Sequence, residues 1–146
     1  MDSGNDTLMM KKIISVYSFL LILTVSGAVK RETFRDASGK TSGTASVSGN
    51  NVIYRDSSGK IKGSSSTSGN ITVFRDSSGK QTGTAQRNGN TIVYRDANGR
   101  ITHTEFRRGN NAVIRDASGR TVLQKNTSGN TTTYRDAQGR IKATKR

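Results

Sequence analysis

Short segments rich in aromatic and β-branched residues recur along the chain, and residues typical of turns bound each segment. In TIVYRDANGRIT, residues 91–102, the segment TIVY precedes the turn signal DANG, and Ile101 follows it. About five to six residues separate successive turns, which is the usual length of a strand. Side chains alternate between the two faces of a strand, so the pattern predicts short antiparallel strands.

The turn signals follow a strict period of 20 residues. In each period an Arg-Asp pair opens one turn and a Gly closes it, and a Gly-Asn pair marks a second turn half a period away. The Arg-Asp pairs stand at 35–36, 55–56, 75–76, 95–96, 115–116 and 135–136, and the Gly-Asn pairs at 49–50, 69–70, 89–90, 109–110 and 129–130. Two turns per period predict two strands per period in a serial or stacked repeat.

The chemistry of the first turn favours a hairpin. Asp96 can accept hydrogen bonds from the turn backbone, and Gly99 can adopt the positive φ that such a turn needs. We therefore predict an all-β fold of repeated antiparallel β-hairpins that form a meander or a curled sheet. The alternative is a β-solenoid, which would stack equivalent Arg residues directly over one another, and like charges so opposed destabilise a sheet.

One face of the predicted sheet is apolar. With residues 96–99 as the loop, we expect Tyr94 to face Ile101 and Ile92 to face His103. The residues expected on this face in other copies are Val52, Tyr54, Ile61, Tyr134 and Ile141, with Gly43, Gly63 and Gly83 beside the aromatic row. Something must cover such a face, either the sheet itself, a second copy or a ligand.

The charge of the chain adds a candidate binding surface. Lys and Arg number 24 against 10 Asp and Glu, a formal net charge of +14, which suits a polyanionic partner. Cations flank every Arg-Asp turn, and we expect these cations to form a stripe along one edge of the sheet. The sequence indicates no structural role for Arg95 or Arg100. The stripe consists of Arg35, Lys40, Arg55, Lys60, Arg75, Lys80, Arg95, Arg100, Arg115, Arg120, Arg135 and Arg140. The competing interpretation is that these cations keep an open sheet soluble and prevent edge-to-edge pairing.

The first 28 residues have the features of a secretory signal peptide. Lys11 and Lys12 precede an apolar run over residues 13–25, and small residues follow as far as Ala28. This order is typical of a cleaved signal, and the apolar run is short for a membrane span. An uncleaved anchor is the alternative.

The predicted domain organisation is therefore simple. Residues 1–28 form the signal peptide, with Met9 or Met10 as alternative starts, and residues 29–146 form one repeat domain of about 5.5 repeats.

GNTTTYRDAQGRI, residues 129–141, resembles the YD repeats of the RHS family, secreted toxin-shell proteins built from spiralling β-hairpins. The family usually has Tyr where this chain has Arg135, and here the aromatic residue is displaced by one position to Tyr134. The residues that match the spacing of the motif are Asp136, Gly139, Arg140 and Ile141. The resemblance implies a hairpin-repeat sheet and does not imply a toxin.

The sequence contains no recognisable catalytic or metal-binding constellation. It has no Cys, which excludes disulfides and thiolate metal sites. His103 is the only His, and Gly occupies its position in three other copies. The regular Asp residues look like turn caps, and a calcium site would need several converging oxygen ligands. We therefore expect a protein that is not an enzyme and that has no cofactor and no metal.

We expect an exported bacterial binding module, located in the periplasm, on the outer surface or outside the cell. Its expected partner is a polyanionic surface polymer or glycan, such as lipopolysaccharide or a cell-wall polymer, rather than nucleic acid. We expect no membrane span after signal cleavage, since the strands of a transmembrane barrel need about 9–11 residues. The alternatives are a structural subunit that forms homo-oligomers through open sheet edges, and a secreted virulence factor.

Overall fold

Twelve antiparallel strands make up the part of the chain that this computed structural model describes, residues 30–146. The predicted signal peptide lies outside the described residues. The strands are β1 (Lys30–Asp36), β2 (Thr41–Ser48), β3 (Asn51–Asp56), β4 (Ile61–Ser68), β5 (Ile71–Asp76), β6 (Gln81–Asn88), β7 (Thr91–Asp96), β8 (Ile101–Arg108), β9 (Asn111–Asp116), β10 (Thr121–Ser128), β11 (Thr131–Arg135) and β12 (Ile141–Lys145). Short turns join them in succession, so the predicted all-β repeat of hairpins is confirmed.

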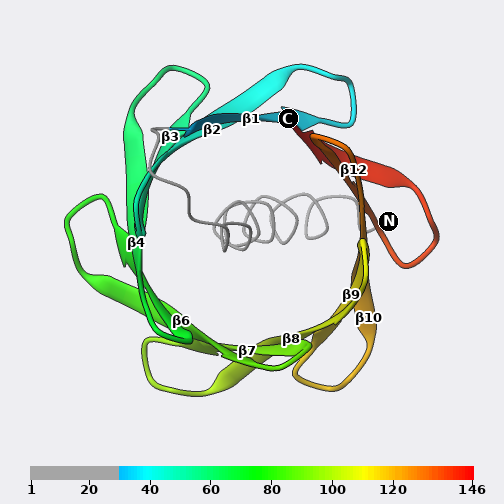
Figure 1. Cartoon of the computed structure of the whole chain (residues 1–146). Helices are drawn as coiled ribbons and strands as arrows, with labels where there is room; N and C mark the ends of the chain where they lie inside the picture. The colour runs from blue at the N-terminus through cyan, green and yellow to red at the C-terminus, as the bar shows by residue number, and fades with distance from the viewer. Residues whose placement is uncertain (1–29) are drawn as a thin grey trace, which may run out of the picture.

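The sheet closes on itself and forms a barrel. Every strand pairs with the next along the chain, and β1 pairs with β12. Figure 1 shows the strands as a ring, with β1 beside β12. The strand order of the predicted meander is confirmed, but the open form and the β-solenoid are both wrong. Sheets twist and coil in a fixed direction, and here that curvature brings the first and last strands into pairing distance.

The seam between β12 and β1 repeats the register used between the hairpins. At the seam Thr144 pairs with Arg35, just as Thr84 of β6 pairs with Arg95 of β7. Beyond this pair, the backbone N–H of Thr33 donates to the Arg146 carbonyl at 2.7 Å, and the Arg146 N–H donates back at 3.1 Å. The seam is therefore one more copy of the joint between neighbouring hairpins.

The turn within each hairpin is a three-residue loop. The Asp96 N–H donates to the Arg100 carbonyl at 2.9 Å, and the Gly99 N–H donates to the Asp96 carbonyl at 3.1 Å. Gly99 has a φ of 81°, which is the left-handed region that residues with a side chain rarely adopt. This is the pattern of a type I turn followed by a Gly bulge.

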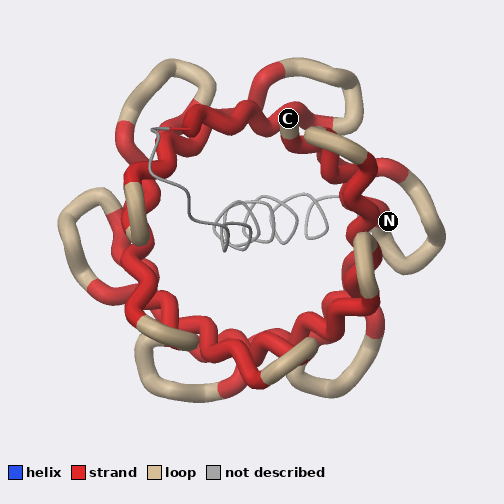
Figure 2. Tube along the Cα trace, in the orientation of Figure 1, coloured by secondary structure: helices blue, strands red, loops and turns tan. Residues whose placement is uncertain are grey.

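The turn between hairpins is a two-residue loop. Asn88 pairs with Thr91, Gly89 has a φ of 57°, and no non-Gly residue among the described ones has a positive φ. Gly at the first of the two loop positions is the mark of a type II′ turn, whose twist suits a tight hairpin. The two kinds of turn lie at opposite ends of the barrel, and Figure 2 shows the Asp–Gly turns flaring outward from the wall.

The register within the hairpins differs from the predicted one. Tyr94 pairs with His103 and Ile92 pairs with Glu105, and the register shifts next to Arg95, which pairs with Ile101. The predicted loop had four residues, whereas the observed loop has three, which shifts the pairing by one residue. A bulge after Ile101 shifts the pairing by one more residue. The bulge also turns Ile101 outward, where 44 % of it is exposed. The expected inward positions of Ile61 and Ile141 are wrong for the same reason, since these residues are 41 % and 44 % exposed.

The aromatic row faces the barrel interior, as its predicted role as a core face requires. Its buried members are Phe34, Tyr54, Phe74, Tyr94 and Tyr134, with Ile114 in the remaining hairpin. The predicted place of Gly beside these rings is confirmed by the pairs Phe34–Gly43, Tyr54–Gly63 and Phe74–Gly83. Where the row has the smaller Ile114, its partner is the larger Leu123. In the three Gly pairs a ring thus lies beside a residue without a side chain, an arrangement that favours dense packing.

The closed seam predicts a cross-link that an open sheet would not form. The chain has no Cys, so the double variant Arg35→Cys, Thr144→Cys carries only the new pair. We expect an intramolecular disulfide, visible as faster migration without reductant, and a gain of up to about 4 kcal/mol because the bridged loop is long. The control pair Arg35→Cys, Thr104→Cys joins strands on opposite sides of the ring and should stay reduced. Intermolecular dimers alone would contradict the closed barrel.

The tight interior around Gly43 predicts a destabilising substitution. An added Cβ at Gly43 would lie 2.5 Å from the Arg55 carbonyl oxygen on the neighbouring strand, and rigid backbone on both sides leaves little room to adjust. We expect Gly43→Ala to lower the free energy of unfolding by about 1–3 kcal/mol, measured by urea denaturation. The exposed neighbour Ser42→Ala serves as the control, and an equal effect of both variants would contradict this account.

Candidate functional site

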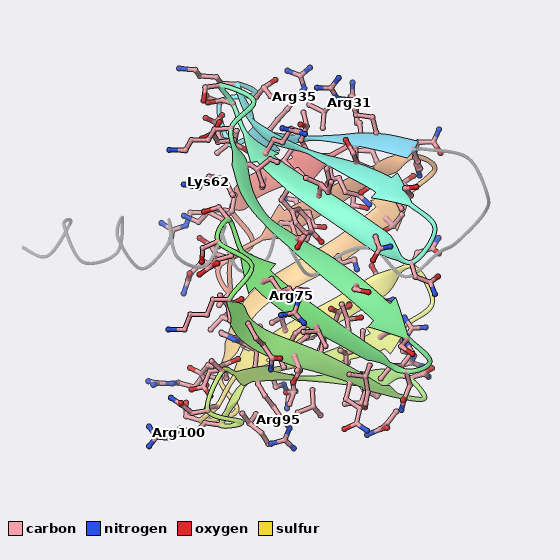
Figure 3. The ribbon with its side chains drawn as sticks, turned by 90° about the vertical axis from the view of Figure 1, so that its left-hand side faces the viewer. Arg31, Arg35, Lys62, Arg75, Arg95 and Arg100 are labelled. Carbon is pink, nitrogen blue, oxygen red and sulfur yellow. The ribbon has the colours of Figure 1, made fainter. Side chains whose placement is uncertain are left out.

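The predicted cationic stripe closes into a ring at one end of the barrel. We name the twelve predicted stripe residues the cation ring, and the two members of each hairpin flank its Asp–Gly turn. Six of them directly follow the turn and are all exposed: Lys40, Lys60, Lys80, Arg100, Arg120 and Arg140. Figure 3 shows Arg100 reaching away from this end, with Arg75 and Arg95 on the outer wall. Closure of the sheet therefore gathers the cations around one opening instead of along a straight edge.

The Arg residues that precede the turns do have a structural role, contrary to our expectation for Arg95. Arg95 Nη1 donates to the Gly99 carbonyl at 3.0 Å, and Arg75 Nη1 donates to the Gly79 carbonyl at 3.1 Å. The same bond recurs at Arg35, Arg55 and Arg135. Each guanidinium is thereby held across its own turn, and the side-chain atoms that face solvent keep a defined position.

The Asp residues of the turns are held by hydrogen bonds from the turn. Asp76 Oδ1 accepts from the Ser78 N–H at 2.9 Å, from the Ser78 hydroxyl at 2.6 Å and from the Lys80 N–H at 3.0 Å. The hydroxyl bond is the main cause that lowers the pKa of Asp76, and the two N–H groups lower it further against the opposing effect of burial. The predicted role of these residues as turn caps is confirmed. Within residues 30–146 no three His, Cys, Asp or Glu side chains lie close enough to hold a metal ion together.

The charge at the turn end is strongly positive even after these Asp residues are counted. The ring contributes 12 cations, Lys62 and Lys142 add two, and the turns hold six Asp, so the balance is 14 − 6 = +8. The carboxylates keep their negative charge, but the cations at this end outnumber them. The turn end is therefore suited to bind negative charge.

A second set of charged residues, which we name the mouth cluster, lies inside the opposite end and was missed by the sequence reasoning. It consists of Glu32, Glu105, Arg107, Lys125 and Lys145. Glu105 is fully buried, and its Oε1 lies 2.6 Å from Arg107 Nε and 3.4 Å from Lys125 Nζ. Its Oε2 accepts from the Tyr94 hydroxyl at 3.0 Å. Burial lowers the pKa of Lys125, and the charge of Glu105 opposes this effect.

The other carboxylate of the mouth cluster lies at the seam. Glu32 Oε1 accepts from Lys145 Nζ at 3.0 Å, and Lys30 Nζ lies 3.6 Å from the same atom. Glu32 Oε2 is buried and has no hydrogen-bond partner among the described residues. The Tyr134 hydroxyl is also buried and has no hydrogen-bond partner among the described residues. Buried polar atoms are nearly always satisfied, so these two atoms mark a place where the barrel interior is prepared for something polar.

Four residues of the mouth cluster, Glu32, Arg107, Lys125 and Lys145, line a pocket of about 440 Å³, and Glu105 lies behind them against Arg107 and Lys125. The charged residues around it are Lys30, Arg31, Glu32, Arg107, Lys125, Lys145 and Arg146. They come from β1, β8, β10 and β12, so the pocket sits over the seam. A departure from the repeat in the sequence could have revealed the pocket. At one position of the even-numbered strands the first three copies carry Ala45, Ser65 and Ala85, whereas the last three carry Glu105, Lys125 and Lys145.

His103 lies in the barrel wall, opposite Tyr94 on one side and Asp116 on the other. Burial lowers its pKa, and the charge of Asp116 works against this shift. It belongs neither to the cation ring nor to the residues that line the pocket.

Comparison of the sequence with protein-family models and with curated proteins finds no match to this chain. Within residues 30–146 there is no helix with the length and apolar character needed to cross a membrane.

The hydrogen-bonded Asp residues predict a loss of stability in acid. A carboxyl whose pKa is lowered on folding stabilises the protein above its ordinary pKa, about 3.9, and this contribution disappears as pH falls through the folded value. We expect the free energy of unfolding to decrease below about pH 4, as measured by urea denaturation across a pH series. The variant Ser58→Ala, Ser78→Ala lacks two of the hydroxyl donors and should lose less stability over this range. Exposed Ser66→Ala is the control, and parallel curves for all three proteins would contradict the assignment.

Proposed function

We propose that this protein is an exported, non-enzymatic binding module that holds a polyanionic surface polymer or glycan on its cation ring. The observation that carries the proposal is the convergence of twelve cations, most of them exposed, at one end of a closed barrel. The signal-like residues 1–28 support export, and an exported bacterial protein meets anionic polymers such as lipopolysaccharide at the cell surface.

The spacing of the ring favours a polymer over a small anion. Equivalent cations of neighbouring hairpins are separated by two strands, which is about 10 Å along the wall. One small anion cannot contact several hairpins at that distance, whereas a charged chain can contact them in succession. Several weak contacts made by one molecule raise its overall affinity well above that of any single contact.

The fixed Arg residues also support this proposal. Arg95 is already held by the Gly99 carbonyl through Nη1, so it loses less side-chain freedom on binding than a free Arg would. Its planar guanidinium retains further N–H donors suited to phosphate, sulfate or carboxylate groups. The lysines that follow the turns have long, flexible side chains, which can adapt to the spacing of the polymer.

The closed barrel gives no support to the alternative of a structural subunit joined through open sheet edges. That alternative requires unpaired strand edges, and the strands described over residues 30–146 leave none, because β1 pairs with β12. No feature of the same residues favours the virulence-factor alternative over a binding module. The resemblance to YD repeats supports the hairpin architecture only.

A charge-matched pair of variants tests the proposal. Lys60→Gln, Lys80→Gln removes two ring cations, and Arg87→Gln, Arg108→Gln removes two cations of the opposite end that do not line the pocket over the seam. We expect the ring variant to bind lipopolysaccharide and heparin more weakly and with a shallower salt dependence. The slope of log K against log salt should decrease by about 0.7 for each cation that no longer pairs with the polymer. The control should resemble the unmodified protein.

The measurement is a titration of labelled polymer over a salt series. Equal decreases in affinity for both double variants would mean that net charge alone attracts the polymer, and they would contradict a ring site. Binding that persists unchanged at high salt would contradict a charge-based site of any kind.

A further inference from the structure

The repeat is kept on the outside of the barrel but broken inside it. At one inward position of the even-numbered strands, the first three hairpins carry small residues and the last three carry charges. The residues at this position are Ala45, Ser65, Ala85, Glu105, Lys125 and Lys145 in chain order. Two residues further along, the residues in chain order are Val47, Thr67, Arg87, Arg107 and Thr127. Of the charged residues at these two positions, Arg107, Lys125 and Lys145 line the pocket over the seam, whereas Arg87 does not.

The fold does not require these charges. Ala45, Ser65 and Ala85 occupy the equivalent place in hairpins that pair in the same register and are buried. Removing a charged group from water is unfavourable, and a buried ion pair commonly adds no net stability over apolar residues. Lys125 and Lys145 are nevertheless held with only 11 % and 12 % of their side chains exposed. Their presence points to a ligand rather than to the stability of the wall.

The charge of the pocket is unbalanced. Six cations line it, Glu32 also lines it and Glu105 lies against its cations, which gives 6 − 2 = +4. Each carboxylate fixes two cations through one oxygen, so Glu105 positions Arg107 and Lys125 while Glu32 positions Lys145 and Lys30. This arrangement holds the cations in place without neutralising all of them. Groups arranged in this way are prepared to accept a compact anion.

Two further polar atoms beside the pocket set a second requirement on the ligand. Glu32 Oε2 can only accept a hydrogen bond, and the Tyr134 hydroxyl can donate or accept one, yet neither has a partner among the described residues. Both residues are at least nine-tenths buried, at 4 % and 6 % exposed. Tyr134 pairs with the pocket residue Lys125, and the charges of Glu105 and Glu32 both act on its hydroxyl. Of the two residues only Glu32 lines the pocket itself, so a hydroxyl group of a ligand could donate to Glu32.

We propose that this pocket binds a small phosphorylated or sulfated sugar, with the anionic group on Arg107, Lys125 and Lys145 and a sugar hydroxyl toward Glu32. The volume of about 440 Å³ suits a molecule of one or two sugar rings, since pockets for small ligands typically measure about 300–1,000 Å³. The site lies at the opposite end from the cation ring, so it is independent of the polymer-binding proposal.

Calorimetric titration of the purified protein with glucose 6-phosphate and glucose 6-sulfate tests the proposal. Inorganic phosphate, inorganic sulfate and glucose serve as the component probes. We expect one saturable site for at least one of the two sugar esters, with a higher affinity than for its inorganic anion or for glucose. Lys125→Ala and Lys145→Ala should each weaken binding about tenfold or more, because hydrogen bonds to charged groups contribute strongly.

These variants are expected to fold, because they introduce the residue that the repeat itself carries in the same position at Ala45 and Ala85. Arg107→Thr, which copies Thr67 and Thr127, is a further variant of this kind. The control Lys60→Ala, Lys80→Ala removes two cations at the opposite end and should leave the sugar-ester affinity unchanged. Circular dichroism and the thermal midpoint confirm that each variant is folded.

Several outcomes would overturn the assignment. One is the absence of saturable binding of both sugar esters at millimolar concentration. Another is an affinity for the inorganic anion equal to that for the sugar ester, since the sugar hydroxyls would then contribute nothing. A third is a folded Lys145→Ala or Arg107→Thr variant that binds as well as the unmodified protein. If neither sugar ester binds while the polymer still binds the cation ring, the pocket proposal is overturned and the polymer-binding proposal is not.

Discussion

The barrel depends on one backbone register that is used at every joint between hairpins and again at the seam. In this register the Arg before each turn Asp pairs with a residue of the preceding strand, as Arg95 pairs with Thr84 and Arg35 pairs with Thr144. Because the same pairing recurs, every hairpin turns the sheet by a similar amount. The last strand therefore meets the first with its hydrogen-bonding groups already in position, and no edge is left open among the described strands.

The two glycine-dependent turns make this register possible. The Asp–Gly turn sets a three-residue loop and a bulge, whereas the Gly–Asn turn sets a two-residue loop. Together they place the aromatic row inside and all the ring cations at one end. The cation ring is thus a consequence of turn geometry and of closure, which returns the sixth hairpin to the side of the first.

Much of this fold could be predicted from the sequence, and the errors have identifiable physical causes. The period of 20 residues and the turn residues were sufficient to predict the hairpins. The alternation of side chains between the two faces of a strand was sufficient to predict that the aromatic row faces inward. Ile101 was misplaced because a bulge inserts one residue without any mark in composition. Closure was not predictable, because the twist of a sheet is set by many small backbone angles that the repeat pattern does not encode.

The candidate sites were predictable to different degrees. The ring residues could be found because they repeat, although the structural role of Arg95 depends on a bond to Gly99 that the sequence does not reveal. The mouth cluster was missed because a search for repetition overlooks departures from it. Glu105 and Lys145 occupy positions that are Ala or Ser elsewhere, and this contrast becomes meaningful only when the strands are known to surround a common interior.

The equivalence of the seam to the other joints has a consequence for how the chain can be cut and rejoined. β1 and β12 are neighbours in the same geometry as β2 and β3 or β6 and β7, so a short Gly-Asn linker across the seam would complete a sixth joint. The polypeptide could then begin at any of the existing Gly–Asn turns, as a circular permutant, with every strand keeping its neighbours. The order of the hairpins along the gene is thus separable from their order around the barrel wall.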